Sequence, residues 1–226
     1  MSELSLPTYE EMVKAGMHFG RKKSIFNPKM KPFVYLLRDN IYIIDLIKTR
    51  QGIISAVDFL KKAIEENKVI LFVGVSKQSA DLVKDMAESL NMPFVVNRWL
   101  GGTLTNFKTI NSRVQHLEAL EKESATGGFD KYTKKERLMK EKELGKLREK
   151  FGGLTKLTRL PDVVFVSSVK ESILAIREAQ VMKIKVAGVV NTESDPNQIA
   201  FPIAANDNAR RSLELIIKSL KDSLKK

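Results

Sequence analysis

Val69-Ile70-Leu71-Phe72-Val73 is a run of five apolar residues that ends at Gly74. A continuous apolar run of this length is typical of a strand that is buried on both faces, as in parallel sheets covered by helices. Apolar residues at helical spacing precede the run, at Ile53, Val57, Leu60 and Ile64, and a helical pattern follows it over 78–90. The stretch therefore predicts a strand between two helices in an α/β domain.

The same alternation continues along the chain. The pattern predicts strands at 94–96, 163–166 and 186–190, and helices at 172–182 and 207–224. Strands that alternate with helices favour a layered α/β domain with a mostly parallel sheet.

The N-terminal region has a different pattern. Thr8-Tyr9-Glu10-Glu11 predicts a capping box before a short helix that ends near Gly16. The lysine-rich stretch 20–32 is expected to be a loop, and the apolar runs 33–37 and 41–44 flank Asp39-Asn40. These turn residues predict a hairpin or a sharp corner.

The segment 106–154 predicts an antiparallel helical hairpin that forms a coiled coil. We expect it to be inserted into an α/β domain made of 1–105 and 155–226. Its two halves repeat apolar residues at spacings of three, four and three, and 126–130 reads as the loop between them. The second half carries nine Lys and Arg between 131 and 150 against four Glu, so either a solvated face or an RNA contact explains it. The repeated apolar positions are Phe107, Ile110, Val114 and Leu117, then Leu144, Leu147, Phe151 and Leu154.

The composition limits the class of protein. The 226 residues carry a net charge of +12, contain no cysteine and include no run of 18 apolar residues. Disulfides and cysteine zinc sites are thereby excluded, and a reducing cytoplasm is consistent with the sequence. The polar residues 1–10 argue against a signal peptide, and we expect no membrane span.

Positive charge without compensating acid is concentrated in two stretches. Residues 12–38 hold seven Lys and Arg, and 89–117 hold three more, with no Asp or Glu in either stretch. A concentrated cationic surface suits a polyphosphate backbone, because each neutralised phosphate releases condensed counterions. We therefore predict a nucleic-acid interface, with RNA-binding candidates Arg21, Lys22, Lys23, Asn27, Lys29, Lys31, Arg98, Thr103, Asn106, Lys108, Arg113, Lys134 and Lys135.

Two strand-to-helix turns are candidates for phosphate binding. Gly101-Gly102 allows close backbone approach, but the spacing favours a structural turn with Trp99 packed as a plug. The turn 74–79 lacks the second glycine of a P-loop and is expected to cap a helix. For Phe26, in the basic stretch, anchoring in the core is favoured over stacking on a base.

Catalytic and metal chemistry have weak candidates. His18 and His116 are the only histidines. A cation site that combines His18 with Asp195 or Asp207 is conceivable, but a histidine without a metal is favoured. No Ser-His-Asp set or paired carboxylates can be assembled, so acid–base catalysis has no candidate. We expect no cofactor and no small-molecule substrate.

Several segments together resemble the bacterial small-subunit ribosomal protein family numbered two, in collinear order across essentially the whole chain. Three segments are the most specific: Ala15–Gly20, Asn27–Phe33 and the run Asn97-Arg98-Trp99-Leu100-Gly101-Gly102-Thr103-Leu104-Thr105-Asn106. Further matches are Ile70–Gly74, Leu160-Pro161-Asp162, Asn191–Pro196 and Ala205–Ala209.

The resemblance implies a flavodoxin-like domain with a protruding helical hairpin and no catalytic activity. It also implies a cytoplasmic, ribosome-bound protein that binds small-subunit ribosomal RNA and joins late in assembly. Its expected neighbours are other small-subunit proteins, including the large RNA-binding protein numbered one, which it helps to dock.

The sequence departs from the family pattern in four places. Arg21-Lys22-Lys23 stands where a His-Gln-Thr-like run is usual, which favours phosphate contact and removes a possible second histidine ligand. Phe26 replaces a tryptophan, and Asn191 replaces a common Asp, which weakens a carboxylate metal site. Many relatives carry an acidic C-terminal extension, and the sequence ends at Lys226, so contacts through such a tail are not carried over.

The sequence thus favours a structural RNA-binding constituent of the small ribosomal subunit. A nucleotide-binding enzyme on the same layered scaffold is the alternative, because α/β sheets host both functions. A peripheral membrane protein is permitted by the basic charge, but no amphipathic segment with a Trp, Phe and Leu face supports it.

Overall fold

The computed structural model describes residues 6–129 and 131–225, and within them two sheets are present. The larger sheet is parallel, with the strand order β5-β4-β6-β7-β8. Its strands are β4 (Ile70–Val73), β5 (Phe94–Val95), β6 (Val163–Val166), β7 (Lys185–Val190) and β8 (Phe201–Ala204). The predicted α/β layered fold with a mostly parallel sheet is confirmed, and this strand order is that of a flavodoxin-like domain.

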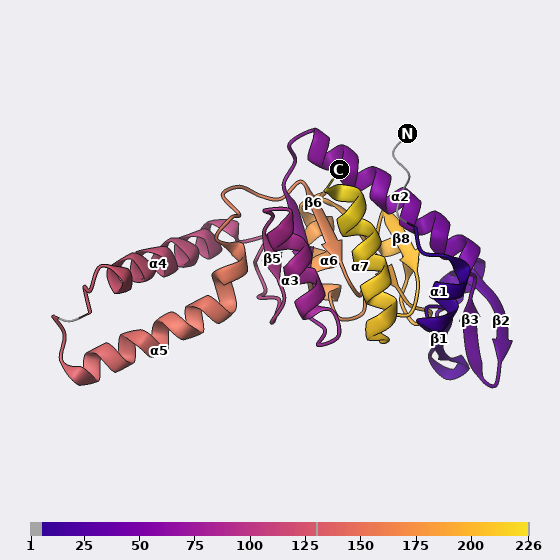
Figure 1. Ribbon diagram of the computed structural model, residues 1–226, viewed down its shortest axis with the longest axis horizontal. Coiled ribbons are helices and arrows are strands. Elements are labelled where there is room, and N and C mark those ends of the chain that lie inside the picture. Colours follow the sequence, from indigo (N-terminus) through magenta and orange to yellow (C-terminus); the bar gives the residue numbers. More distant parts are fainter. Residues whose placement is uncertain (1–5, 130, 226) are drawn as a thin grey trace.

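Helices cover both faces of the parallel sheet (Figure 1). One apolar cluster joins alternate strand residues such as Ile70, Phe72 and Phe165 to α2 (Leu46–Glu65), α3 (Ala80–Ser89) and α7 (Arg210–Leu224). The residues between them, such as Leu71 and Val73, belong to a second cluster with α6 (Ile173–Val181). Burial on both faces explains why β4 and β6 are continuous apolar runs.

The helical hairpin lies at one end of the molecule, away from the sheet (Figure 1). It consists of α4 (Phe107–Ala125) and α5 (Lys134–Phe151), and a 3₁₀ turn, η3 (Gly152–Leu154), follows it. The seam residues Ile110, Val114, Leu117 and Leu144 are buried and belong to the same apolar cluster as Leu71 of the sheet. The hairpin was therefore predicted correctly, whereas its description as a coiled coil and the domain division stay predictions.

The N-terminal region lies at the opposite end (Figure 1). The helix α1 (Tyr9–Lys14) begins at the predicted capping box of Thr8 and Glu11. β2 (Val34–Arg38) and β3 (Ile41–Ile44) form the predicted hairpin, because Asp39 and Asn40 adopt φ values of +48° and +61°.

The expected loop at 20–32 is wrong in part. β1 (Phe19–Lys22) pairs with β3 in the antiparallel order β1-β3-β2, and two 3₁₀ turns follow, η1 (Lys23–Ile25) and η2 (Pro28–Phe33). The short β1 has no apolar alternation, and its register with β3 is irregular, so the sequence gives little strand signal.

The strand β8 was not predicted. Pro202 lies within it, and proline weakens a strand assignment because it cannot donate a ladder hydrogen bond. β8 pairs with β7 alone and ends the sheet, where a proline is tolerated. A 3₁₀ turn, η4 (Pro196–Gln198), precedes it.

Candidate nucleic-acid interface

The basic segment that begins at Arg21 is docked against the end of β7. Gly20 lies so close to this region that an added Cβ would stand 2.6 Å from Cγ2 of Thr192. The backbone N–H of Arg21 donates to Oγ1 of Thr192 at 2.7 Å, and the N–H of Asn27 donates to the Thr192 carbonyl at 2.9 Å. These contacts fix the start of the segment to the parallel sheet.

The Arg21 side chain lies inside a polar network. Its Nε lies 2.8 Å from Oε1 of Glu193, and its Nη2 lies 2.8 Å from Oδ1 of Asn208 and 3.5 Å from Oδ1 of Asp207. Asp207 is almost fully buried and also accepts hydrogen bonds from Ser168 at 2.6 Å and Asn191 at 2.7 Å. The charge of Arg21 is therefore compensated within the chain.

This network fills the carboxyl edge of the sheet. In open α/β sheets this edge is the usual site for ligands. Here Ser168 and Asn191 follow β6 and β7, and both bind Asp207. At the switch point between β4 and β6, the hydroxyl of Ser167 donates to Ser79 at 2.7 Å, and both serines are buried.

The middle of the basic segment is anchored as well. The Phe26 ring stacks on Tyr42 with centroids 3.9 Å apart, which agrees with the anchoring role predicted for it. The side chain of Asn27 accepts the N–H of Lys29, and Nζ of Lys29 binds Asp195 at 2.5 Å. This Lys29 contact, aided by the N–H of Asn197, holds the pKa of Asp195 below its usual value.

Three lysines of the segment point to solvent. Lys22, Lys23 and Lys31 are exposed, and none of them has an ion pair within the described part of the chain. They are therefore the members of the predicted set in this region whose charge is free for a phosphate.

The glycine-containing loop after β5 is held by one carboxylate. Oε1 of Glu178 accepts the indole N–H of Trp99 at 3.0 Å and the N–H of Gly102 at 2.8 Å. Oε2 accepts the N–H groups of Leu104 at 2.9 Å and Thr105 at 3.2 Å. Burial acts to raise the pKa of Glu178, but these hydrogen bonds outweigh it and lower the pKa.

This arrangement decides between the two uses considered for Gly101-Gly102. The amide of Gly102 that a phosphate would need is bound to Glu178, and Trp99 is 5% exposed, so the loop is a structural turn with a tryptophan plug. Thr103 is 1% exposed, and its hydroxyl donates to the Leu100 carbonyl at 2.6 Å. A side-chain contact of Thr103 with RNA is therefore inconsistent with its burial.

The base of the hairpin brings further cations together. Arg98, Lys108 and Arg113 are exposed. Asn106 occupies the N-cap position of α4 without a side-chain capping bond, and its Oδ1 accepts from the Thr109 hydroxyl at 2.9 Å. A groove of about 440 Å³ places Arg98 beside Arg148 and Lys150 of α5. This groove joins residues that are about 50 positions apart in the sequence.

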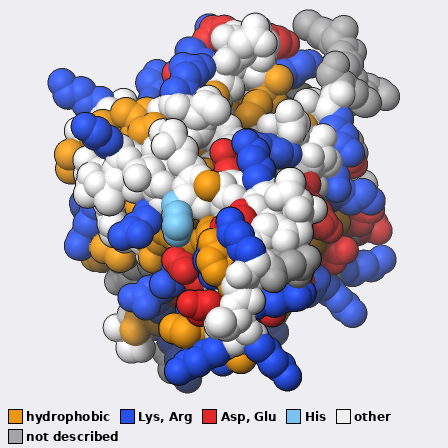
Figure 2. Space-filling view, turned by 90° about the vertical axis from the view of Figure 1, so that its left-hand side faces the viewer, with side chains coloured by type: hydrophobic (Ala, Val, Ile, Leu, Met, Phe, Trp, Pro, Cys, Tyr) orange, Lys and Arg blue, Asp and Glu red, His pale blue; other side chains and the backbone are white. Residues whose placement is uncertain are grey.

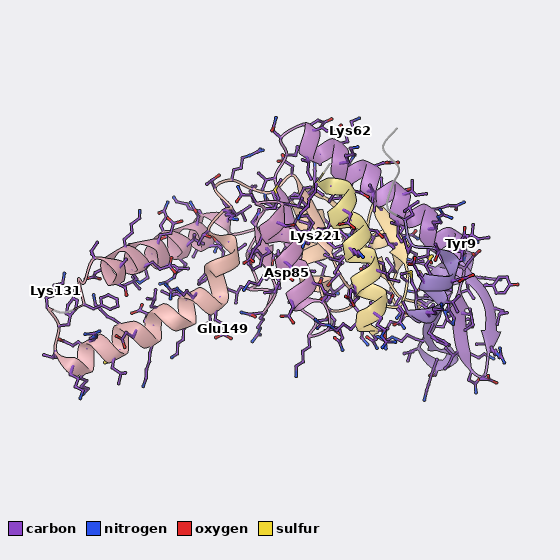
Figure 3. The ribbon with its side chains drawn as sticks, viewed as in Figure 1. Tyr9, Lys62, Asp85, Lys131, Glu149 and Lys221 are labelled. Carbon is purple, nitrogen blue, oxygen red and sulfur yellow. The ribbon has the colours of Figure 1, made fainter. Side chains whose placement is uncertain are left out.

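The tip of the hairpin is organised by Glu123. Its carboxylate binds Lys140 at 3.0 Å, Lys131 at 3.2 Å and the Tyr132 hydroxyl at 3.0 Å, and chiefly the Lys140 contact lowers the pKa of Glu123 to about 2. Figure 3 shows Lys131 at this tip, and Tyr9 at the opposite end of the molecule. Lys134 and Lys135, which begin α5, are exposed and are not part of this cluster.

The hairpin end of the molecule displays Lys and Arg side chains interspersed with Asp and Glu (Figure 2). On α5, Arg148 is paired with Glu121 at 2.5 Å and Arg137 with Glu141 at 3.0 Å. Part of the basic face of α5 is therefore neutralised within the hairpin, which the residue count could not show.

The conceivable metal site does not assemble. Asp195 is bound to Lys29, and Asp207 is bound to Arg21, Asn191 and Ser168. Within 6–129 and 131–225, no cluster of three potential metal ligands occurs. His18 is half-buried against Phe19, with ring centroids 4.1 Å apart, and desolvation lowers its pKa.

The sequence did not single out the carboxylates that organise these loops. Glu178, Glu123 and Glu193 lie on helices or turns with ordinary charged surroundings, and their partners come from distant segments. The only available signal was the surplus of donors in the glycine-containing loop, which requires an acceptor from elsewhere in the fold.

Comparison with known proteins agrees with this architecture. The sequence model of the ribosomal protein S2 family matches residues 12–226. This chain belongs to that family. Its members are ribosomal structural proteins and not enzymes, so the nucleotide-dependent enzyme considered above is discarded.

Members of the S2 family from distant organisms are similar over nearly the whole chain. The small ribosomal subunit protein uS2 of Petrotoga mobilis is 41% identical over 221 residues, which are 98% of this chain and 77% of that protein. The uS2 protein of Bifidobacterium adolescentis is 42% identical over 96% of this chain and 80% of its own length. The uS2c protein of Phaeodactylum tricornutum is 41% identical over 99% and 98%.

Among the residues that the structure describes, none of the helices combines the length and the apolar character needed to cross a bilayer.

Proposed function

We propose that this S2-family chain is a structural constituent of the small ribosomal subunit and binds ribosomal RNA through its exposed, unpaired cations. The relatives at about 40% identity are named small ribosomal subunit proteins, which supports the proposal that this chain is part of the small ribosomal subunit. The observation that carries the RNA contact is the division of the basic segment into paired Arg21 and Lys29 and free Lys22, Lys23 and Lys31.

The mechanism is electrostatic docking of a preformed surface. The segment around Lys22 is held by Thr192 and Tyr42, so its lysines meet RNA without a large ordering cost. The second cationic zone, with Lys108, Arg113, Lys134 and Lys135 on the hairpin and Arg98 at its base, lies at the other end of the molecule. Two separated zones support simultaneous contact with two RNA surfaces, or with an RNA and a protein.

A protein neighbour is part of the same proposal. Three consecutive large apolar residues of β2 are exposed, Tyr35 at 72%, Leu36 at 40% and Leu37 at 41%. A contiguous exposed apolar patch is typical of an interaction surface. We assign this face to a protein contact, and the family resemblance supports late assembly and docking of the large RNA-binding protein numbered one.

The test is incorporation into subunits with paired variants. Replacement of Lys22 and Lys23 by Gln removes only unpaired charge, so the folded protein should be retained and its incorporation at raised salt should fall. Lys218→Gln, at an exposed position of α7 outside the groove that contains Arg98, is the matched control for loss of charge. Normal incorporation of the Lys22/Lys23 variant across the salt range would remove this segment from the interface.

A further inference from the structure

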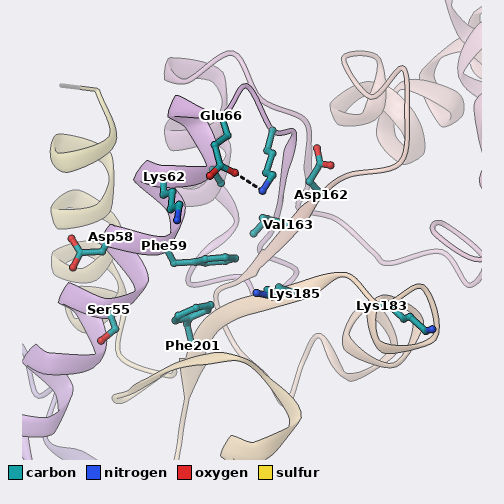
Figure 4. A pocket seen from close by; sticks show the side chains of 12 residues that line it. Ser55, Asp58, Phe59, Lys62, Glu66, Asp162, Val163, Lys183, Lys185 and Phe201 are labelled. Carbon is teal, nitrogen blue, oxygen red and sulfur yellow. Dashed lines mark ion pairs between the residues drawn. The ribbon is translucent and has the colours of Figure 1, made fainter.

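A groove of about 760 Å³ lies at the amino ends of the parallel strands (Figure 4). Val163, Lys185 and Phe201 are the first residues of β6, β7 and β8, and all three line the groove. Its other wall is the C-terminal half of α2, with Phe59 and Lys62. This is the opposite edge of the sheet from the network around Arg21.

The groove contains a pair of stacked aromatic rings. Phe59 and Phe201 lie with ring centroids 4.0 Å apart and planes inclined by 16°, and both residues are only partly buried (Figure 4). A planar apolar surface that remains accessible is what a nucleobase stacks on, and such stacking does not depend on which base is present.

The charges around the rings are of two kinds. Lys68 is paired with Glu66, and Asp162 accepts from Arg159 at 3.0 Å and from the N–H of Val69 at 2.9 Å. Lys62 and Lys185 have no ion pair within the part of the chain that the structure describes. Two free ammonium groups beside an aromatic stack match a phosphate joined to a base.

We propose that this groove binds one unpaired nucleotide of single-stranded RNA, with its base on the Phe59–Phe201 stack and its phosphate at Lys62 and Lys185. This inference rests on the proposed function as an RNA-binding protein and adds a contact outside the two cationic zones. Asp58 and Ser55 at the same groove supply acceptors for an N–H group of a base, such as the ring N–H of uracil.

The lining favours a nucleotide over an acidic peptide. Asp58 has no ion pair among the described residues, so its carboxylate favours a ligand that brings an N–H donor as well as an anionic group over a chain of carboxylates. A nucleotide brings one phosphate and a base with donor groups, so both signs of charge in the groove have a partner.

The experiment uses the full chain and a fluorescein-labelled hexauridylate, with binding followed by anisotropy. Phe201→Leu keeps an apolar side chain but removes the ring, and we expect about tenfold weaker binding because stacking is lost. A Lys62→Gln, Lys185→Gln variant should also bind about tenfold more weakly and show a flatter dependence on salt. Lys218→Gln is the matched control and should bind as the parent does, and thermal melts report the folding of every variant.

Two further measurements separate the base from the charge and locate the site. An abasic hexamer with the same number of phosphates should bind about tenfold more weakly than hexauridylate. Hexamers with 4-thiouridine, crosslinked by light and mapped by mass spectrometry, should label peptides that contain Phe59 or Phe201.

Some outcomes would reject the nucleotide site in the groove but not the proposed function. Equal binding of the abasic hexamer, equal binding of a hexaglutamate peptide, or crosslinks confined to 20–32 and the hairpin would reject the nucleotide site. The proposed function would stand in those cases. Absence of binding to any RNA, together with absence from subunits, would reject both proposals.

Discussion

The carboxylate of Glu178 accepts the indole N–H of Trp99 at 3.0 Å, and this contact joins α6 to the loop between β5 and α4. The same carboxylate binds three backbone N–H groups of that loop. Because α4 starts immediately after the loop, Glu178 sets the position from which the whole hairpin leaves the sheet domain.

Replacement of Glu178 by Gln should destabilise this junction. The amide offers one acceptor oxygen in place of two and places its own donors beside N–H groups, so we expect a loss of about 2 kcal/mol. Urea unfolding followed by Trp99 fluorescence measures the change. Glu171→Gln, at an exposed position before α6, is the control and should change stability by less than about 0.5 kcal/mol.

The stability of the protein should fall in acid in part through the same group. The pKa of Glu178 is lower in the folded state than its ordinary value of 4.5, so its contribution is present above that pH. The contribution is lost as the pH falls below about 4.5 through the folded-state pKa. Unfolding measured between pH 7 and pH 3 should show a smaller acid loss for Glu178→Gln, and parallel curves would contradict this account.

Substitution of Arg21 should affect mainly stability, whereas substitution of the two lysines that follow it should affect mainly RNA binding. Arg21→Ala leaves the buried carboxylate of Asp207 and the largely buried carboxylate of Glu193 without their guanidinium, which should cost about 3 kcal/mol. The Lys22→Gln, Lys23→Gln variant removes exposed charge and should leave stability within about 0.5 kcal/mol while weakening RNA binding. Thermal melts and filter binding compare the two, and equal destabilisation would reject the division.

The ion pairs of Glu123 at the hairpin tip should persist to a lower pH than an ordinary glutamate would allow. The pKa of Glu123 is lowered to about 2, chiefly by Lys140, so its ion pairs persist to about pH 2 and are lost below it. Amide exchange at the tip should therefore be slower in the parent than in Glu123→Gln between about pH 3 and pH 7. Equal exchange would show that the Lys131, Lys140 and Tyr132 contacts do not order the tip.

The sequence predicted the parts of the fold that depend on local pattern. Buried strands such as β4 and the seam of the hairpin have periodicities that survive in the structure, because each element buries one continuous set of side chains. The sequence did not predict β1, because this strand is short and irregularly paired, or β8, because this strand contains Pro202.

The candidate interface was harder to predict, because a residue list cannot show which charges are paired. Arg21 and Lys29 bind carboxylates more than 160 residues away in the chain, whereas Lys22 and Lys23 between them remain free. The burial of Thr103 likewise depends on Glu178 and α6, which lie about 75 residues further along the chain.

The most direct test of the central claim is sucrose-gradient fractionation of a lysate that contains the protein, at low and at high salt. The account predicts that the protein sediments with small ribosomal subunits at low salt and is released at high salt, because the docking is electrostatic. Sedimentation as a free small protein at low salt would contradict it.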